Sequence, residues 1–209
     1  MRIDLHVHTS PRSQCSSIDP IQLMERAQSI GLQGVCLTEH GIMWDKQEVE
    51  ELQRTHENVR ILRGMEVTTN QGDVLVFGLS RDIKNIVPIE ELRREVLAAG
   101  GFMVAAHPFR GFLLFGITQL QVSPEQACRR PLFQNVDGVE IGNCKVTQPE
   151  NEMARQVALR LGLAKVAGSD AHSLEELGRW VTVFQREIRN ELELVEELRQ
   201  GRFSVEQAL

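Results

Sequence analysis

Residues 2-RIDLHVHTS-10 have the pattern of a buried β-strand, and yet they carry two histidines at its end. In a strand, residues two positions apart point to the same side. His6 and His8 therefore project together, and two neutral imidazoles on one side can hold one divalent ion. This pairing raises the question of whether other strands in the chain end in the same way.

Short apolar runs alternate with amphipathic helical patterns through the rest of the chain, so we expect parallel β/α units. The sequence NQGD at 70–73 predicts a hairpin turn, and Asp19, Pro20 and Gly31 are typical of the two ends of a helix. This order predicts an α/β fold, a distorted seven-stranded (β/α)7 barrel that is TIM-barrel-like. We expect strands at 2–6, 34–40, 59–68, 102–108, 136–143, 164–172 and 180–185, and helices at 19–31, 45–56, 88–101, 149–162 and 191–201.

The composition is that of an ordinary globular chain, with 209 residues, 42% hydrophobic and 25% charged. No repeat or Pro/Gly/Ser linker divides it, so we expect a single domain over residues 1–209. No apolar run is long enough to cross a bilayer, and Asp4, His6 and His8 interrupt any signal-peptide pattern. We therefore expect a cytoplasmic protein that does not contact a membrane. The four cysteines are scattered, without a CxxC pair, and the net charge of −6 disfavours non-specific binding of nucleic acid.

Potential metal ligands stand at the ends of nearly all the expected strands, and in β/α barrels these ends meet on one face. Burying so many titratable groups without a cation would be costly. A mixed set of imidazoles and carboxylates suits Zn²⁺, Mn²⁺ or Fe²⁺, and seven ligands are more than one ion needs. We therefore expect two or three divalent ions. The seven candidate ligands are His6, His8, His40, Glu66, His107, Asp170 and His172, whereas His56 is expected on the surface.

The pieces DLHVHTS, LTEHG, GMEVTT, AAHPFR, VEIGN and AGSDAH resemble, in this order, the motifs of the PHP (polymerase and histidinol phosphatase) family. They run from near residue 3 to residue 172. The resemblance implies a distorted seven-stranded barrel that hydrolyses phosphoesters with up to three metals at the strand ends. It also implies that Glu66 bridges two ions. The implied sets are His6, His8, Glu66 and Asp170 for the first ion, Glu66 and His107 for the second, and His40 and His172 for the third.

This chain departs from the family pattern in the second motif and in the residues just after the first motif. Glu39 stands where the family usually has aspartate, and we expect it to orient a neighbour. The ligand that usually follows the first motif is missing, and Gln14 or Cys15 can replace it.

A third departure lies near residue 143, where related proteins can place another ligand of the second ion. Cys144, Asn143 and a water are the alternatives there. Cys144 can equally be a loop thiol without a role.

The implied reaction is attack of a metal-activated water on a phosphomonoester or a short phosphodiester. Asp170 and His172 are expected to be catalytic, and either His172 or a water protonates the leaving oxygen. Arg110 and Arg12 are expected to contact the phosphate, with ordinary surface ion pairs as the alternative. Asp4 has the strand parity of His6, so it is expected to hold the ligand imidazoles, with an exposed or turn-binding aspartate as the alternative.

The expected substrate is a small phosphorylated molecule such as histidinol phosphate or a nucleotide. The alternatives are a nuclease-like member acting on nucleic-acid ends, a non-catalytic metal-binding regulatory barrel, and an amidohydrolase. Tyrosine is absent, which argues against a long single-stranded substrate. The apolar segment 111-GFLLFGITQLQV-122 is expected to be a short helix packed on the barrel, or else to line the substrate mouth or a subunit contact. The oligomeric state is left open.

Overall fold

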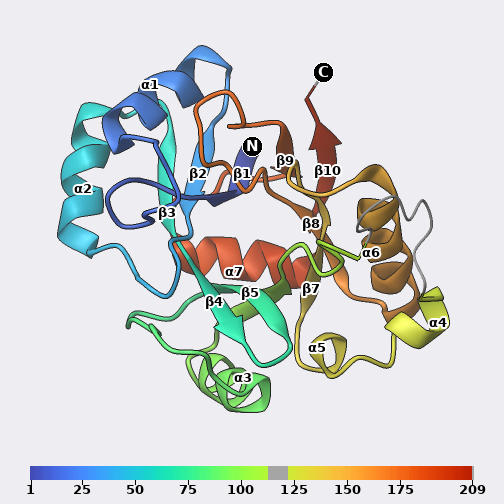
Figure 1. The fold of residues 1–209 in the computed structure, drawn as a ribbon. Coiled ribbons are helices and arrows are strands. Elements are labelled where there is room, and N and C mark those ends of the chain that lie inside the picture. The colour runs from blue at the N-terminus through green and yellow to red at the C-terminus, as the bar shows by residue number, and fades with distance from the viewer. Residues whose placement is uncertain (113–121, 209) are drawn as a thin grey trace.

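The computed structural model describes residues 1–112 and 122–208, which form ten strands and seven helices (Figure 1). The strands are β1 (Arg2–Val7), β2 (Gly34–Leu37), β3 (Arg60–Arg63), β4 (Met65–Thr69), β5 (Gly72–Phe77), β6 (Phe102–Ala105), β7 (Gly138–Gly142), β8 (Ala164–Ala167), β9 (Trp180–Phe184) and β10 (Phe203–Gln207). The helices are α1 (Pro20–Ser29), α2 (Lys46–Thr55), α3 (Ile89–Ala98), α4 (Pro124–Ala127), α5 (Pro131–Gln134), α6 (Gln148–Leu161) and α7 (Glu191–Gln200). Most of the apolar segment 111–122 lies outside the described residues.

These strands form two five-stranded sheets, in the orders β10-β9-β1-β2-β3 and β4-β5-β6-β7-β8. The mixed α/β class is therefore confirmed, whereas a seven-stranded (β/α)7 barrel is not, because no continuous ladder closes the described strands. Only β1-β2-β3 and β6-β7-β8 are parallel. The β4–β5 hairpin, the β5–β6 pair and the pairs of β9 with β1 and β10 are antiparallel, and they replace the expected β/α repeats.

Gly64 is the point at which the chain passes from one sheet to the other. The sequence pattern predicts one strand over 59–68, but β3 and β4 belong to different sheets. A Cβ at Gly64 would lie 2.7 Å from the Phe77 ring, so only glycine fits where the chain crosses. The sequence pattern thus predicted one strand where the structure has two, because a single apolar run does not reveal a change of sheet.

Three apolar clusters hold the layers together. The central cluster lies between the sheets and is closed by α7, with Leu5 of β1, Phe77 of β5 and Leu194 of α7 among its members. A second cluster packs α3 and α6 against the β4–β8 sheet, and a third packs α1 and α2 against β1–β3. Figure 1 shows α1 and α2 on one side of the strands and α6 on the opposite side. Each fully buried large side chain contributes about 1.5–3 kcal/mol to this packing.

Local signals in the sequence predict the helix ends well. The Asp19 carboxylate accepts hydrogen bonds from the backbone of Ile21 (2.9 Å) and Gln22 (3.1 Å), and thereby caps α1. The NQGD turn joins β4 to β5, as expected. The sequence pattern did not predict β10 or the short helices α4 and α5.

The two sheets meet where the candidate ligands stand. Isolated bridges pair Val7 with Ala171 and His40 with Glu66, so each bridge joins one sheet to the other beside a ligand. The backbone of Ala171 also accepts from His8 (3.0 Å). The seam between the sheets therefore places the strand ends next to one another. Within the described residues, no helix is both long and apolar enough to span a membrane.

We predict that Gly168→Ala lowers the free energy of unfolding by about 1–3 kcal/mol, because overpacking forces the backbone to shift. An added Cβ would lie 2.5 Å from the Cβ of His6 and 2.6 Å from its backbone nitrogen. Urea unfolding measures the effect, and Ser204→Ala, on the exposed side of β10, is the control, expected within about 0.5 kcal/mol of the unmodified protein. Equal stability of the two variants would contradict the close approach of β8 to β1.

Candidate metal centre

The structure brings all seven candidate ligands together at the seam. Three groups have ligand atoms within 4.8 Å of one another, and they share members. The groups are His6 with His8 and Asp170, His6 with Glu66 and His107, and His8 with His40 and His172. His56 lies apart from them, at the end of α2.

The three donor atoms of the first group and Glu66 Oε2 face a common point. The Nε2 atoms of His6 and His8 are 3.0 Å apart. Each lies 3.4–3.6 Å from Glu66 Oε2 and from Asp170 Oδ1. Donor atoms on one tetrahedral ion, bound at 2.0–2.2 Å, are about 3.4 Å apart, so the spacing suits one ion.

Glu66 connects the first group to the second through its two oxygens. Its Oε1 lies 2.9 Å from His107 Nε2, while Oε2 faces His6 and His8. His107 Nε2 is also 3.9 Å from Asp170 Oδ2. A carboxylate placed in this way can bridge two ions.

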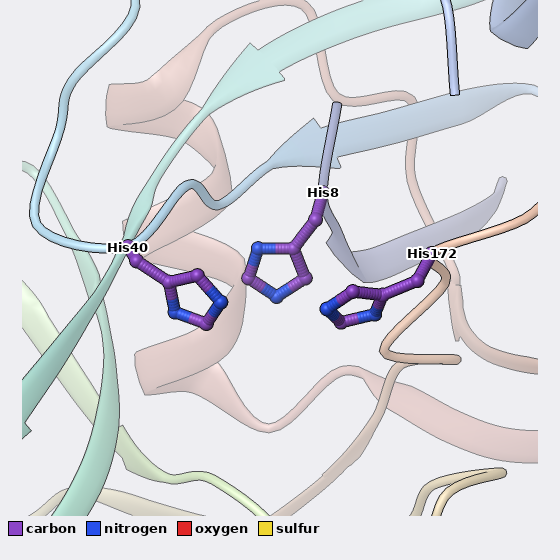
Figure 2. Close-up of side chains that lie close together, drawn as sticks. All are labelled: His8, His40 and His172. Carbon is purple, nitrogen blue, oxygen red and sulfur yellow. The ribbon is translucent and has the colours of Figure 1, made fainter. Parts of the chain in front are cut away.

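The third group is formed by three imidazoles that come from different elements (Figure 2). The ring centroid of His8 lies 4.3 Å from that of His40 and 4.5 Å from that of His172. His40 Nδ1 contacts Glu66 Oε2 at 2.9 Å, so its Nε2 is the nitrogen left for this group. In Figure 2, His40 and His172 point a ring nitrogen toward each other.

Neighbouring acceptors select the tautomers of three of these imidazoles. Glu140 Oε1 lies 3.0 Å from His6 Nδ1, and the carbonyl of Asp170 lies 2.8 Å from His172 Nδ1. Both oxygens can only accept, so both Nδ1 atoms carry a proton and Nε2 is the nitrogen that a metal can bind, after displacing any proton there. His8 is oriented in the same way by a hydroxyl, as described next.

Glu39 orients His8 through Ser13 and does not join the ligand groups. The buried Glu39 carboxylate accepts hydrogen bonds from Thr9, Ser13 and Trp44. Because the Ser13 hydroxyl donates to Glu39, its oxygen accepts the Nδ1 proton of His8, at 3.2 Å. The expectation that Glu39 orients a neighbour agrees with this geometry.

The charges of the cluster favour a bound cation. Burial tends to raise the pKa of the Glu66 carboxyl, but His6, His107 and His40 outweigh it and hold that pKa well below its usual range. Burial likewise opposes the charge of His6, but Asp170, Glu140 and Glu66 raise its pKa well above the ordinary value. The carboxylates therefore stay ionised, and a divalent ion that displaces the proton of His6 would satisfy them. Imidazole nitrogen with carboxylate oxygen is a donor set that fits Zn²⁺, Mn²⁺ or Fe²⁺.

Two of the candidate ligands adopt backbone conformations that residues other than glycine rarely adopt. His107 has φ 28° and Asp170 has φ 55°. Such conformations cost about 1–3 kcal/mol each and persist where the surrounding structure enforces them. Here the backbone N–H of His107 donates to Glu140 Oε2 at 2.8 Å. The main chain is thus bent to aim these side chains at the cluster.

Glu140 is the main residue that sequence reasoning missed. It is buried, and its carboxylate accepts from His6, from the backbone of His107, and from Asn143 Nδ2 at 2.9 Å. The sequence did contain a signal for Glu140, because an acidic residue stands there between the apolar Val139 and Ile141 in an expected strand. One carboxylate thus orients ligands of both the first and the second group.

The two side chains considered for the second ion have other partners. Asn143 donates to Glu140, and the Cys144 thiol donates to the carbonyl of Ser169. Burial, followed by Glu176, raises the pKa of Cys144 to about 12. Of the three alternatives at this position, a water is the one consistent with these contacts.

Of the two alternatives for Asp4, the one that holds an imidazole is wrong, because its carboxylate contacts the main chain and no imidazole among the described residues. It accepts from the backbone nitrogens of His6 (3.2 Å), Ser169 (2.8 Å) and Gly178 (2.9 Å). Strand parity placed Asp4 on the correct side but did not reveal that backbone N–H groups are closer. Asp4 thereby ties β1 to the segment that follows β8.

The two predicted phosphate-binding arginines have different surroundings. The half-exposed Arg110 lies at the rim of the cluster, with Nη1 3.4 Å from Asp170 Oδ2. Arg12 instead stacks over the Trp44 ring, at 3.8 Å, and pairs with Glu48 of α2.

A cavity of about 370 Å³ adjoins the cluster and is lined by His107, Arg110 and Arg130 among others. Arg130 was not predicted. Its guanidinium donates to the carbonyl of Pro108 at 2.7 Å and lies 5.3–5.5 Å from three phenylalanine rings. A larger cavity, of about 760 Å³, lies near α7, β8 and β10 and contains none of the candidate ligands.

Comparisons with known proteins identify a domain family and solved structures of similar fold. A family model described as "PHP domain" matches residues 4–127, and one described as "PHP-associated" matches residues 148–203. The chain is 25% identical over 118 residues to the uncharacterized protein MJ1587 of Methanocaldococcus jannaschii, covering 52% of this chain and 68% of that protein.

Two solved structures have a similar fold. One is a two-domain protein of Bacteroides vulgatus, described as containing a "predicted PHP-like metal-dependent phosphoesterase", with a TM-score of 0.70 and 22% identity over 99% of this chain. This chain spans 64% of that protein. The other is an amidohydrolase of Chromobacterium violaceum with bound sulfate, with a TM-score of 0.68 and 15% identity over 99% of this chain and 98% of that one. At these identities the likeness shows the fold alone.

We predict that Glu140→Gln weakens divalent metal binding about 10- to 100-fold, as is usual when the partner of a ligand histidine is lost. Glutamine offers one oxygen to three donors, so either His6 or His107 loses its orientation. Isothermal titration calorimetry with Zn²⁺ or Mn²⁺ measures the change. Glu193→Gln, on α7, serves as the control, and unchanged affinity in Glu140→Gln would contradict the assigned role.

A second prediction concerns the pH dependence of stability in the metal-free protein. Burial raises the pKa of Asp4 to about 6, against the opposing hydrogen bonds from Ser169, Gly178 and His6. Folded Asp4 thus binds a proton more tightly than unfolded Asp4, so its contribution to stability falls as pH rises from about 4 to 6.

The stability of the unmodified protein minus that of Asp4→Asn should therefore fall by about 2.4 kcal/mol between pH 4 and pH 7. Urea unfolding at each pH measures both proteins. A difference that is constant with pH would show that Asp4 titrates normally.

Proposed function

Because the chain belongs to the PHP domain family, we propose that it is a metal-dependent phosphoesterase that hydrolyses a small phosphorylated substrate. The observation that carries the proposal is the convergence of seven imidazoles and carboxylates into three overlapping groups at one seam. The substrate is a phosphomonoester or a short phosphodiester, and the centre holds two or three Zn²⁺, Mn²⁺ or Fe²⁺ ions.

The proposed ligands divide among the ions by their contacts. His6, His8, Glu66 and Asp170 hold the first ion, Glu66 and His107 the second, and His8, His40 and His172 lie around the third. When bound, such ions neutralise phosphate charge and lower the pKa of a bound water. Glu140, Ser13 and the carbonyl of Asp170 keep the Nε2 atoms aimed at these positions.

The residues beside the cluster support a phosphate as the ligand. Within residues 1–112 and 122–208, the contact found for the Arg110 guanidinium is with one oxygen of Asp170, at 3.4 Å, which leaves most of its donors for a substrate. Arg130 lines the same cavity, and no carboxylate partner is found for it in the described part of the chain. Residues 113–121 contain no acid either. Two guanidinium groups without a bidentate carboxylate suit the oxygens of a phosphate.

Asp170 and His172 are the proposed catalytic residues. The Asp170 carboxylate lies within 3.9 Å of His8, His107 and Arg110, so it positions metal and substrate groups together. His172 keeps its Nε2 directed into the cluster because its Nδ1 proton is held by Asp170. Either His172 or a water then protonates the leaving oxygen.

A second candidate is an amidohydrolase, which is the description of the Chromobacterium violaceum protein that shares this fold. Against it, the ion pairs printed for lysines among the described residues lie away from the seven ligands: Lys46 pairs with Glu50, Lys84 with Asp82 and Lys145 with Glu176. The nuclease-like and the non-catalytic alternatives remain further outcomes of the same experiment.

The test combines metal analysis with substrate assays. Protein purified without chelator is examined for metal content and for release of phosphate from small phosphomonoesters, from phosphodiesters and from oligonucleotides with terminal phosphates, with amides in parallel. Phosphate release that stops on chelation and returns with metal is the expected result. Cleavage of amides alone would favour the amidohydrolase, and bound metal without turnover would favour the regulatory barrel.

We predict that His8→Ala loses bound metal and activity together while the fold persists. Its Nε2 contributes to two of the three groups. Because bound ions supply several kcal/mol of transition-state stabilisation, activity should fall at least about 1,000-fold. Circular dichroism checks the fold, and His56→Ala is the matched control. Unchanged activity in His8→Ala would overturn the proposed centre.

A further inference from the structure

The third group has fewer ligands of its own than an ion needs. His8 Nε2 already lies 3.0 Å from His6 Nε2, within the first group. That leaves His40 Nε2 and His172 Nε2 as the donors that belong to the third group alone. A zinc ion takes at least three protein ligands, so one donor is missing.

Cys15 lies beside the free nitrogen of His40. Its Sγ is 3.3 Å from His40 Nε2, the nitrogen that Glu66 leaves unused. A cysteine sulfur and a histidine nitrogen on one tetrahedral zinc ion are about 3.6 Å apart. Gln14, the other residue considered at this position, is exposed, and the described contacts of the cluster do not include its side chain.

The loop that carries Cys15 is tied to the ligands themselves. Ser16 Oγ donates to the carbonyl of His8 at 2.7 Å, and the backbone nitrogen of Ser17 donates to the carbonyl of His172 at 3.0 Å. The two residues after Cys15 are thus bonded to the backbone of two histidines of the third group. The thiol is therefore held at this position by the same strand ends that aim the imidazoles.

We propose that Cys15 is a ligand of the third ion, together with His40 and His172, and that it makes this position selective for a thiophilic ion. This inference rests on the metal centre of the proposed function. The thiol gives its proton to solvent when it binds. Soft thiolate with imidazole favours Zn²⁺ or Co²⁺ over Mn²⁺ or Mg²⁺, whereas the carboxylate-rich first group accepts either kind. His172 is then a ligand, and the proton for the leaving oxygen comes from water.

Cobalt provides the test, because a thiolate bound to Co²⁺ gives a charge-transfer band in the near ultraviolet that imidazole and carboxylate ligands do not give. Metal-free protein is titrated with Co²⁺ as the unmodified chain, as Cys15→Ser and as Cys128→Ser, a matched control cysteine at the end of α4. The band is expected in the unmodified chain and in Cys128→Ser. Cys15→Ser should lose the band and bind one ion fewer.

A further variant distinguishes loss of the thiolate from loss of the third metal site. Cys15→His should restore the number of bound ions without the band. A band that persists in Cys15→Ser, or its absence from the unmodified chain while Co²⁺ binds, would overturn the assignment of Cys15 but not the first two ions. Failure of Co²⁺ to bind the unmodified chain at all would overturn the metal centre itself.

Alkylation provides a second measurement that needs no variant. Cys15 is exposed and should react with iodoacetamide in the metal-free protein. Saturation with Zn²⁺ should slow modification of Cys15 at least about tenfold and leave Cys128 unaffected, as read by peptide mass. Equal rates with and without Zn²⁺ would count against the proposal.

Discussion

The buried carboxylate of Glu66 is the constraint on which the rest of the site depends. It lies at the start of β4, directly after the chain crosses between the sheets, and four imidazoles surround it. An ionised carboxylate in the interior must have positive or hydrogen-bonding partners, since isolation there would be very costly. These partners come from both sheets, so the requirements of one charge hold the seam together. The same requirement makes the seam a place for divalent cations.

A second set of acceptors makes the cluster directional. Glu140 fixes His6 and the backbone of His107, Ser13 fixes His8 with the help of Glu39, and the carbonyl of Asp170 fixes His172. Each of the Nδ1 contacts leaves an Nε2 lone pair facing inward. Asp4 performs the corresponding task for the main chain, where it joins β1 to Ser169 and Gly178. The ligands are thus oriented before any ion arrives, which lowers the cost of binding one.

The surroundings of the cluster differ from one side to the other. On the side of His107, Arg110 and Arg130 line a cavity suited to an anion. On the side of His40, Cys15 places sulfur beside imidazole. Under the proposed function, a centre with oxygen-rich positions and one soft position can hold different ions at once, and the arginine side is where the proposed phosphate would approach. The two sides differ because Cys15 lies in the segment after β1, whereas Arg110 follows β6 and Arg130 follows α4.

Much of this protein follows from its sequence, because local rules act over a few residues. Strand parity places His6 and His8 on one side, Asp19 caps α1, and the motifs identify the PHP domain family. Sequence patterns do not reveal which distant groups meet. Only the tertiary structure separates β3 from β4 into different sheets, pairs Arg12 with Glu48 and not the cluster, and brings Glu140 to His6 and Cys15 to His40. The physical reason is that periodicity determines the side of an element on which a residue lies, whereas its partner is chosen by packing between segments far apart in the chain.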